Sequence, residues 1–384
     1  MALGKHRQDL ILLIATISTV LFGIVMIYSA SVIVGYTDFN DPKYFFKRQL
    51  IWAVVGIIAL ITTSNIDYRS WKKWATALMI TTILLLLSVF LFTKGSVNGA
   101  HRWITFLGQT FQPSELAKFS FLVYICAWFT KMQDQVKSFR ATFFPFLGML
   151  AVISILMLME PDFGTLSIML ASVIAVFVVA GMSFQQFVVG LGTSVVAMGG
   201  ILAVPYRRAR ILTFLDPSGG SDAVKYHIQN ISIAIGSGGW FGVGYGASSQ
   251  KRLFLPEPHT DSIFAIIIEE LGLVVGIAIV AVFSLIIYRG YRIAAQTQDP
   301  FGRLLAVGIT TWIGFQAFIN LASMLGIVPL VGVPLPFISY GGTNLMISLA
   351  AMGVLLNISR YTGDKDAIVV PQQKRRRGAQ HAQK

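Results

Sequence analysis

Long apolar runs separated by short polar connections make up almost all of this chain. About ten of the runs have the length of a bilayer-crossing helix, which takes roughly 20 apolar residues. A membrane-spanning β-barrel would show short strands of alternating polarity instead. The pattern therefore predicts an all-α polytopic membrane protein with about ten transmembrane helices. Their expected positions are residues 10–34, 49–64, 75–93, 113–130, 141–159, 165–181, 184–204, 261–288, 304–327 and 344–358.

Positive charge falls mainly in every second connection between these helices. Cytoplasmic connections carry the excess of Lys and Arg, so this distribution predicts that both termini are cytoplasmic. The other side then carries a large extracellular loop, residues 205–260, between the seventh and eighth helices. Residues 1–361 are expected to form the transmembrane domain, and residues 362–384 a basic, disordered cytoplasmic tail. The cations that set the orientation are Lys5, Arg7, Arg69, Lys72, Lys73, Lys131, Lys137, Arg140, Arg289, Arg292, Arg303 and residues 374–377.

Composition and motifs exclude several classes of protein. Of the 384 residues, 55% are hydrophobic and 12% are charged, and the mean hydropathy of +0.70 is too high for a soluble domain. One cysteine, Cys126, allows no disulfide framework. No metal-ligand spacing of Cys and His, no Walker phosphate loop and no serine nucleophile elbow is present. The glycine-rich run 236–246 follows no strand, so tight turns are expected there rather than a dinucleotide site.

The densest group of ionisable residues stands directly before the eighth helix, in residues 255–261. Glu257, His259 and Asp261 lie there within five positions of one another. Ionisable groups at membrane depth are costly, and such a cluster is a functional hypothesis by default. Asp261 is the first candidate for a catalytic residue.

Two further candidate groups lie at the starts and ends of the fourth to sixth helices. Glu115 and Lys118 are three positions apart on one helical face, where an opposite-charge pair serves either a ligand or only the structure. Asp162 follows the fifth helix, whose C-terminal dipole disfavours acidic residues, so nearby cations are expected to compensate. Arg102, Lys118 or the arginines of the large loop could supply that charge.

The large loop and the last connection complete the set of candidates. Arg207, Arg208 and Arg210 suggest an anionic partner, although solubilising loop charge remains the alternative. Ser339 and Tyr340, in residues 334–343, either present polar groups to a ligand or form a structural turn. Carboxylates and cations at one membrane face suit a displacement in which a carboxylate takes a proton and cations stabilise an anionic leaving group. A lipid-linked pyrophosphate is the substrate type that fits.

Four segments, residues 111–118, 160–165, 255–261 with 269–272, and 334–342, resemble the SEDS family (shape, elongation, division and sporulation). The resemblance implies a peptidoglycan glycosyltransferase that polymerises lipid II at the outer face of the bacterial plasma membrane. It assigns the catalytic aspartate to Asp261 and places Glu115 and Lys118 in the substrate site. Residues 214–217 and 247–251 are more similar to the division branch than to the elongation branch. Ser262 departs from the aromatic residue expected after the aspartate.

The resemblance also implies a mechanism and a set of partners. Asp261 would deprotonate the acceptor 4-hydroxyl, which attacks the donor sugar with inversion, while arginines or Lys118 bind the pyrophosphate. A divalent cation, Mg²⁺ or Mn²⁺, could share that load through Asp162 or Glu257, although no ligand spacing demands one. The expected partners are lipid II, the nascent glycan chain, a class B penicillin-binding transpeptidase and the division or elongation complex, with no nucleic acid. An elongation polymerase, a lipid II flippase and a non-catalytic scaffold remain alternative functions.

Overall fold

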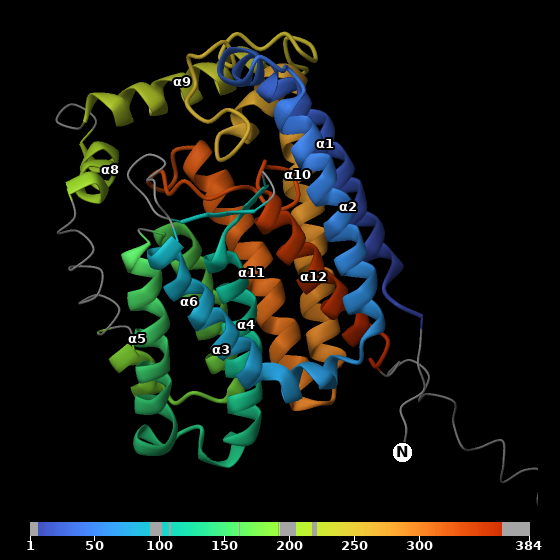
Figure 1. Ribbon diagram of the computed structural model, residues 1–384, viewed down its shortest axis with the longest axis vertical. Helices are drawn as coiled ribbons and strands as arrows, with labels where there is room; N and C mark the ends of the chain where they lie inside the picture. The colour runs from blue at the N-terminus through green and yellow to red at the C-terminus, as the bar shows by residue number, and fades with distance from the viewer. Residues whose placement is uncertain are drawn as a thin grey trace, which may run out of the picture.

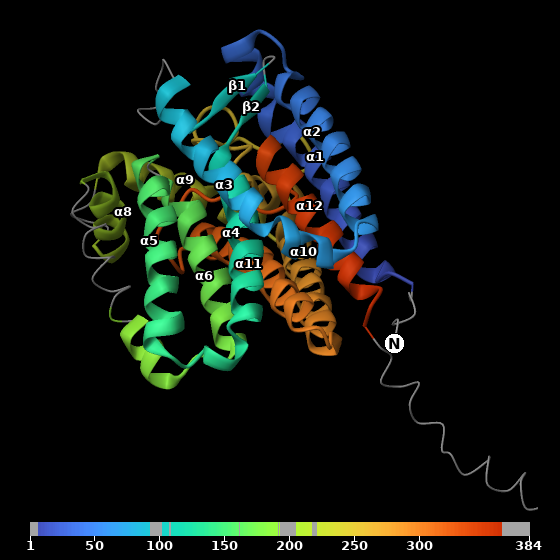
Figure 2. The same ribbon diagram turned by 60° about the horizontal axis from the view of Figure 1, so that its bottom comes forward.

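The computed structural model is a bundle of long helices covered at one end by a cap of shorter elements (Figure 1). It describes residues 7–92, 102–106, 109–160, 162–190, 192, 205–216 and 221–362. The two strands pair as a short antiparallel hairpin (Figure 2). The elements are α1 Leu10–Phe39, α2 Tyr44–Asn65, α3 Tyr68–Phe92, β1 Ile104–Phe106, β2 Gln109–Phe111, α4 Pro113–Lys131, α5 Phe144–Met159, α6 Phe163–Ala180, α8 Pro205–Leu215, α9 Asp222–Gly238, α10 Ile263–Gln296, α11 Pro300–Met324 and α12 Gly342–Ser359.

The predicted fold class is confirmed: the protein is a polytopic helical membrane protein. Within the described residues, eight helices are long and apolar enough to cross a membrane. The fourth predicted helix, α4, is not among these eight, because it carries Glu115 and Lys118 within its 19 residues. Most of the seventh predicted helix, and all but residue 362 of the predicted tail, lie outside the described residues.

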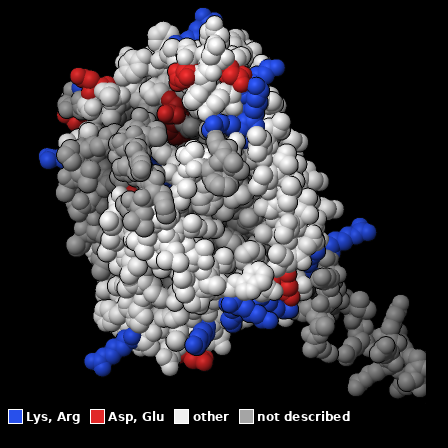
Figure 3. Space-filling view, in the orientation of Figure 1, with Lys and Arg blue, Asp and Glu red and all other residues white. Residues whose placement is uncertain are grey.

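Short polar caps fix where the helices begin. Asp9, Asp162 and Asp299 each accept a hydrogen bond from a backbone N–H in the first turn of α1, α6 and α11. The connections α4–α5 and α10–α11 lie at the end of the bundle where α1 begins (Figure 1). There Arg289 Nε donates to Asp9 Oδ2 at 2.8 Å. On the face shown in Figure 3, charged atoms gather toward the two ends of the molecule and leave an almost uncharged band between them.

The large predicted loop is not irregular, because it contains two helices. α9 lies across one end of the bundle, with α8 beside it (Figure 1). The apolar residues Ile228, Ile231 and Ile235 recur along one face of α9 with helical spacing. The helices α8 and α9 are too short, and their sequences too polar overall, to suggest membrane spans. For this reason the hydrophobic pattern did not predict them.

The eighth predicted helix, residues 261–288, is helical, and the structure adds a break that the hydrophobic pattern did not indicate. Gly272 interrupts α10 with φ 83° and ψ 173°. A Cβ placed on Gly276 would lie 3.6 Å from the Phe264 ring. In a straight helix these two residues would be about 18 Å apart, so the first part of α10 folds back against the second. This bend positions Asp261, which directly precedes the buried first part.

Candidate functional site

Asp261 is held in place by α11. The Asn320 side-chain amide donates to the backbone carbonyl of Asp261 at 2.8 Å and to that of Val333 at 2.7 Å. One buried amide therefore ties the segment before α10 to the segment after α11. The Asp261 carboxylate accepts a hydrogen bond from Thr260 Oγ1 at 3.0 Å.

Among the three arginines of α8, Arg210 is the one that the structure places beside this carboxylate. A Cβ built on Gly332 would lie 3.4 Å from both Arg210 Nη1 and Asp261 Oδ2. The guanidinium and the carboxylate thus face the same small space, which stays open because residue 332 has no side chain. Arg210 Nη1 also donates to the Leu330 carbonyl at 3.0 Å. Arg208 is exposed, and the side chain of Arg207 lies outside the described residues.

Burial raises the pKa of Asp261, and neither the Thr260 hydrogen bond nor the Arg210 charge reverses that effect. A carboxylate transferred from water to a less polar site holds its proton more tightly. A raised pKa makes Asp261 a stronger base once it is ionised.

Glu257 is the second carboxylate of this site. Thr260 Oγ1 lies 3.2 Å from Glu257 Oε2 and 3.0 Å from Asp261 Oδ1, so one hydroxyl bridges the two acids. The pKa of Glu257 is raised, first by burial and then by the charge of Asp261. Glu257 has a left-handed backbone, with φ 48°, which turns the chain sharply before Asp261.

The sequence suggested Asp162 or Glu257 as a ligand of a divalent cation, and the structure suits only Glu257 to that role. Asp162 accepts hydrogen bonds through both oxygens, from Ser114, Gln112 and Thr165, which leaves it poorly suited to a metal. Glu257 lies beside Asp261, and Mg²⁺ is often held by one or two carboxylates together with substrate phosphates. Within the described residues no group of three or more His, Cys, Asp or Glu could hold a metal ion.

His259 and Tyr340 pack together on the far side of this segment. Tyr340 N donates to the His259 carbonyl at 2.8 Å, and the His259 ring lies 4.1 Å from the Phe45 ring. Burial lowers the pKa of His259 to about 4, so the ring is neutral at pH 7. Ser339 Oγ accepts a hydrogen bond from Leu335 N at 2.7 Å and closes a turn. These contacts show a structural role, and binding of substrate by the three residues remains a prediction.

His227 belongs to the site and was not predicted from the sequence. Its Nε2 lies 2.9 Å from Ser262 Oγ, and Ser262 Oγ donates to the Pro256 carbonyl at 3.1 Å. The pKa of His227 is lowered to about 4, first by burial and then by Arg210. At Ser262, where the resemblance led us to expect an aromatic residue, the side chain makes a hydrogen bond to α9. The only signal for His227 in the sequence was its position on the amphipathic helix α9, next to Ile228 of the apolar face.

Glu115 and Lys118 form a buried ion pair inside the bundle, with 2.8 Å between Oε2 and Nζ. Asn344 Nδ2 donates to Glu115 Oε2 at 2.8 Å, and Lys118 Nζ donates to Gln316 Oε1 at 3.3 Å. Gln316 also donates to the Pro334 carbonyl at 2.9 Å. Because Gln316 precedes Asn320 by one helical turn on α11, the ion pair and Asp261 are anchored to the same helix and the same connection.

Asp162 and Arg102 both lie close to Glu160. Arg102 Nε donates to the Glu160 carbonyl at 2.9 Å. The pKa of Glu160 is raised to about 8 by burial and by Asp162, against the lowering effect of Arg102. The expected conflict with the helix dipole is thus relieved by protonation of Glu160, while Asp162 caps the start of α6, where negative charge is favourable.

These residues adjoin the Asp261 site. A Cβ on Gly164, in the first turn of α6, would lie 2.6 Å from Val333 Cγ2 and 3.7 Å from the Gly332 carbonyl. Gly332 faces Asp261 and Arg210. The start of α6 and the Asp261 carboxylate therefore lie on either side of a single stretch of backbone.

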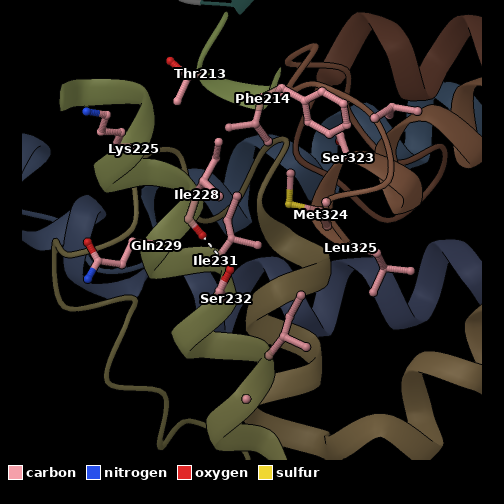
Figure 4. A pocket seen from close by; sticks show the side chains of 15 residues that line it. Thr213, Phe214, Lys225, Ile228, Gln229, Ile231, Ser232, Ser323, Met324 and Leu325 are labelled. Carbon is pink, nitrogen blue, oxygen red and sulfur yellow. Dashed lines mark hydrogen bonds between the residues drawn. The ribbon is translucent and has the colours of Figure 1, made fainter. Parts of the chain in front are cut away.

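An apolar cavity of about 710 Å³ lies between α8, α9 and the end of α11 (Figure 4). Ile228, Ile231 and Ile235 of α9 and Met324 of α11 form much of its lining. Leu330 also lines the cavity, and its carbonyl accepts the hydrogen bond from Arg210. The cavity and the Asp261–Arg210 space are therefore neighbours.

Comparison with known proteins agrees with this arrangement. The family model for FtsW, RodA and SpoVE, described as "Cell cycle protein", matches residues 9–364. The fold and the site thus define a polytopic membrane protein of the SEDS class, and the chain belongs to the FtsW/RodA/SpoVE family. It is 41% identical over 357 residues to "Probable peptidoglycan glycosyltransferase FtsW" of Geobacter metallireducens, covering 92% of this chain and 95% of the relative.

Other similar proteins come from different branches of the family. "Stage V sporulation protein E" of Bacillus subtilis is 39% identical over 367 residues, covering 94% of this chain and 100% of the relative. A solved chain from "Structural coordination of polymerization and crosslinking by a peptidoglycan synthase complex" superimposes with TM-score 0.76 at 26% identity, covering 92% of this chain and 98% of that one. Thermus thermophilus RodA gives TM-score 0.67 at 25% identity, covering 92% and 97%. The predicted resemblance to the SEDS family is confirmed.

Proposed function

We propose that this protein is a peptidoglycan glycosyltransferase that polymerises lipid II into β-1,4 glycan strands for septum synthesis in cell division. The observation that supports this most directly is the pairing of Asp261 and Arg210 around Gly332. One acid with a raised pKa and one cation in the same space are what a sugar transfer from a diphosphate requires. The active site would face outward from the bacterial plasma membrane, with both termini in the cytoplasm.

The proposed reaction is a single displacement. Asp261 takes the proton from the 4-hydroxyl of the acceptor sugar, and that oxygen forms a bond to C1 of the donor sugar. The bond between C1 and the diphosphate oxygen breaks, and its electron pair leaves with the diphosphate. Arg210 stabilises the departing negative charge through charge-assisted hydrogen bonds. Attack opposite the leaving group inverts the configuration at C1.

The other predicted substrate residues have supporting roles in this proposal. Lys118 and Glu115 hold α11 and the connection after it in register through Gln316. Arg102 and Asp162 lie near the start of α6, which contacts residues 332 and 333, and in this proposal they hold and line the acceptor side of the site. Glu257, together with the phosphates of the donor, would hold a divalent cation, Mg²⁺ or Mn²⁺, which would neutralise part of the diphosphate charge.

The neighbouring cavity suits the lipid part of the donor. Isoprenoid chains are apolar and branched, and the apolar part of the cavity lining consists of Phe214, Ile228, Ile231, Ile235, Met324, Leu325, Val328 and Leu330. It adjoins Arg210 through Leu330. We assign to it the isoprenoid units next to the diphosphate, so that the chain and the head group bind on the two sides of Leu330.

The expected partner is a class B penicillin-binding transpeptidase within the division complex. The support is the structural similarity to a chain of a peptidoglycan synthase complex that coordinates polymerisation and crosslinking. Similarity to stage V sporulation protein E over its whole length supports a second candidate role, glycan synthesis for the spore. Depletion would separate these roles, because loss of a division enzyme gives filaments and loss of a sporulation enzyme leaves vegetative growth unchanged.

The test is polymerisation of lipid II by the purified full-length protein and its Asp261→Asn variant. Asp222→Asn, at an exposed position on α9, is the matched control. Asp261→Asn should abolish glycan synthesis while thermal unfolding stays close to that of the parent, and Asp222→Asn should change neither. Normal synthesis by Asp261→Asn would remove this residue from the role of base. Flipping of labelled lipid II without polymerisation by the parent would identify a transporter.

A further inference from the structure

The segment between α9 and the Asp261 loop, residues 239–254, exposes many large apolar side chains. Monomeric proteins in water seldom expose contiguous apolar patches of this kind, and such patches mark interaction surfaces. Phe241 is 84% exposed and Trp240 is 64% exposed. The exposed side chains of this segment, here called the outer segment, are Trp240, Phe241, Val243, Tyr245, Leu253 and Phe254.

The backbone of the outer segment completes the broken helix α10. The break at Gly272 frees carbonyl and N–H groups that a continuous helix would pair. Backbone groups at membrane depth must be satisfied within the protein, and here the outer segment satisfies them. Three of these hydrogen bonds run from Val243 N to Glu269 O at 2.9 Å, from Gly244 N to Glu270 O at 3.0 Å and from Leu273 N to Gly239 O at 2.9 Å.

The buried polar side chains of the outer segment are Ser248, Gln250 and Lys251, whereas Arg252, near its end, is exposed. Lys251 Nζ lies 2.6 Å from Glu270 Oε1, and both residues are buried. Glu269 accepts hydrogen bonds from Ser249 N and Ser249 Oγ at 2.9 Å. An element with a buried ion pair and exposed apolar side chains has the polarity of a lipid-exposed structure. The exposed Arg252 fits this arrangement because a long basic side chain at the end of such an element extends its charge to the head groups.

Contacts with α1 give the depth of the outer segment. α1 has 30 residues, and a hydrocarbon core about 30 Å thick takes about 20 residues of helix. Any stretch of that length inside α1 contains residues 20–29. Tyr245 donates a 3.0 Å hydrogen bond to the Val25 carbonyl, and Lys251 Nζ donates to Ser29 Oγ at 3.1 Å. The outer segment therefore reaches residues of α1 that must lie within the hydrocarbon core.

The geometry points to a re-entrant membrane element: the outer segment dips into the leaflet on the Asp261 side, and its exposed apolar side chains contact phospholipid. Tryptophan and tyrosine are enriched at this membrane depth, where an apolar ring and a polar atom are both accommodated. The outer segment closes the break at Gly272 and continues to Asp261. Its depth in the bilayer therefore determines how far the Asp261 carboxylate lies from the hydrocarbon core.

Spin-label accessibility tests this inference without reference to any enzymatic activity. In a Cys126→Ser background, which removes the single, buried cysteine, a nitroxide is attached at Phe241→Cys. The full-length protein is placed in liposomes of phosphatidylethanolamine and phosphatidylglycerol. Collision of the label with oxygen, which concentrates in lipid, is compared with collision with a water-soluble nickel complex. Leu21→Cys, 56% exposed on α1, serves as the lipid control, and Asp134→Cys, exposed in the α4–α5 connection, as the water control.

The label at Phe241→Cys should resemble the one at Leu21→Cys in its preference for oxygen. Accessibility to nickel as high as at Asp134→Cys would overturn the inference. So would protection from both reagents, because that result would mean that a second copy or another protein covers the patch. An independent readout is the quenching of tryptophan fluorescence by brominated lipids. Trp240→Phe should reduce the fraction of the fluorescence that these lipids quench. An unchanged fraction would also overturn the inference.

Discussion

The side-chain amide of Asn320 donates a 2.8 Å hydrogen bond to the backbone carbonyl of Asp261, which is 59 residues away in the sequence. The same nitrogen donates to the carbonyl of Val333 at 2.7 Å. The position of the carboxylate thus depends on a residue in the outer half of α11 rather than on its own neighbours in the chain. Several of the predictions below follow from this dependence.

Asn320→Leu should lower the polymerisation rate per folded molecule, in addition to destabilising the protein. The substitution keeps a similar volume but leaves two carbonyls without their donor, at a cost of about 1–3 kcal/mol. It also frees the Asp261 backbone, so the expected loss of rate is roughly tenfold or more, since small displacements of reacting groups are costly. Lipid II polymerisation and thermal unfolding would be measured together.

Asn357→Leu is the matched control for this variant. Asn357 also makes two buried hydrogen bonds through its side chain, to Ser64 O and from Tyr68 N, but at the other end of the bundle. It should lose similar stability and retain its rate per folded molecule. Equal loss of rate in both variants would show that Asn320 does not position Asp261.

The Glu115–Lys118 pair is expected to show strong coupling in stability. Lys118→Met alone leaves a buried carboxylate without its partner, which costs about 3–5 kcal/mol. Combining it with Glu115→Gln removes that uncompensated charge and should recover much of the stability. Thermal unfolding of the two single variants and the double variant measures the coupling. If the double variant is stable but inactive, Lys118 acts on substrate as well as on structure, as the family resemblance predicts.

Arg210→Gln should weaken use of the donor far more than Arg208→Gln does. Arg210 faces Asp261 across Gly332, whereas Arg208, two positions earlier on α8, is exposed. Loss of charge-assisted hydrogen bonds worth about 1.5–3 kcal/mol corresponds to a fall of roughly 10- to 100-fold in kcat/KM. Steady-state kinetics with varied lipid II gives the ratio. Equal effects of the two substitutions would point to a general role of positive charge on α8.

Glu160 should make the protein less stable as pH rises. Its pKa is raised from 4.5 to about 8 in the folded state, so the folded protein binds the proton more tightly than the unfolded chain does. The resulting stabilisation is fully present below pH 4.5 and is lost between that pH and about 8. Glu160→Gln imitates the protonated acid and should flatten this part of the thermal-unfolding profile. An unchanged slope would mean that Glu160 is ionised at neutral pH.

Two glycines of α9 should respond in opposite ways to alanine. A Cβ at Gly238 would collide with the backbone carbonyl of Ile268, whereas a Cβ at Gly236 would meet no atom within 4 Å. Gly238→Ala should therefore separate α9 from the first part of α10 and reduce both stability and activity. Gly236→Ala should stabilise the protein by about 1 kcal/mol through helix propensity. Similar melting temperatures for the two variants would contradict the close approach of α9 to α10.

Local sequence features determined most of the fold. Apolar runs of spanning length predicted the membrane helices, because burial in lipid acts on every residue of a run independently of tertiary contacts. Helix starts were also readable: Pro113 begins α4 and the expected start of that helix is correct. Asp261 was predicted as a candidate because an acid at membrane depth is costly wherever the chain places it.

Tertiary structure decided how these parts meet. The bend of α10 at Gly272 has no local signal in the sequence. It depends on hydrogen bonds from the glycine-rich segment before Asp261, which is distant from Gly272 along the chain. Likewise, only packing shows that Arg210 reaches Asp261 while Arg208 is exposed, and that Asn320 holds the carboxylate in place. Such contacts join residues far apart in the sequence, and their energies depend on a geometry that exists only after the helices have packed together.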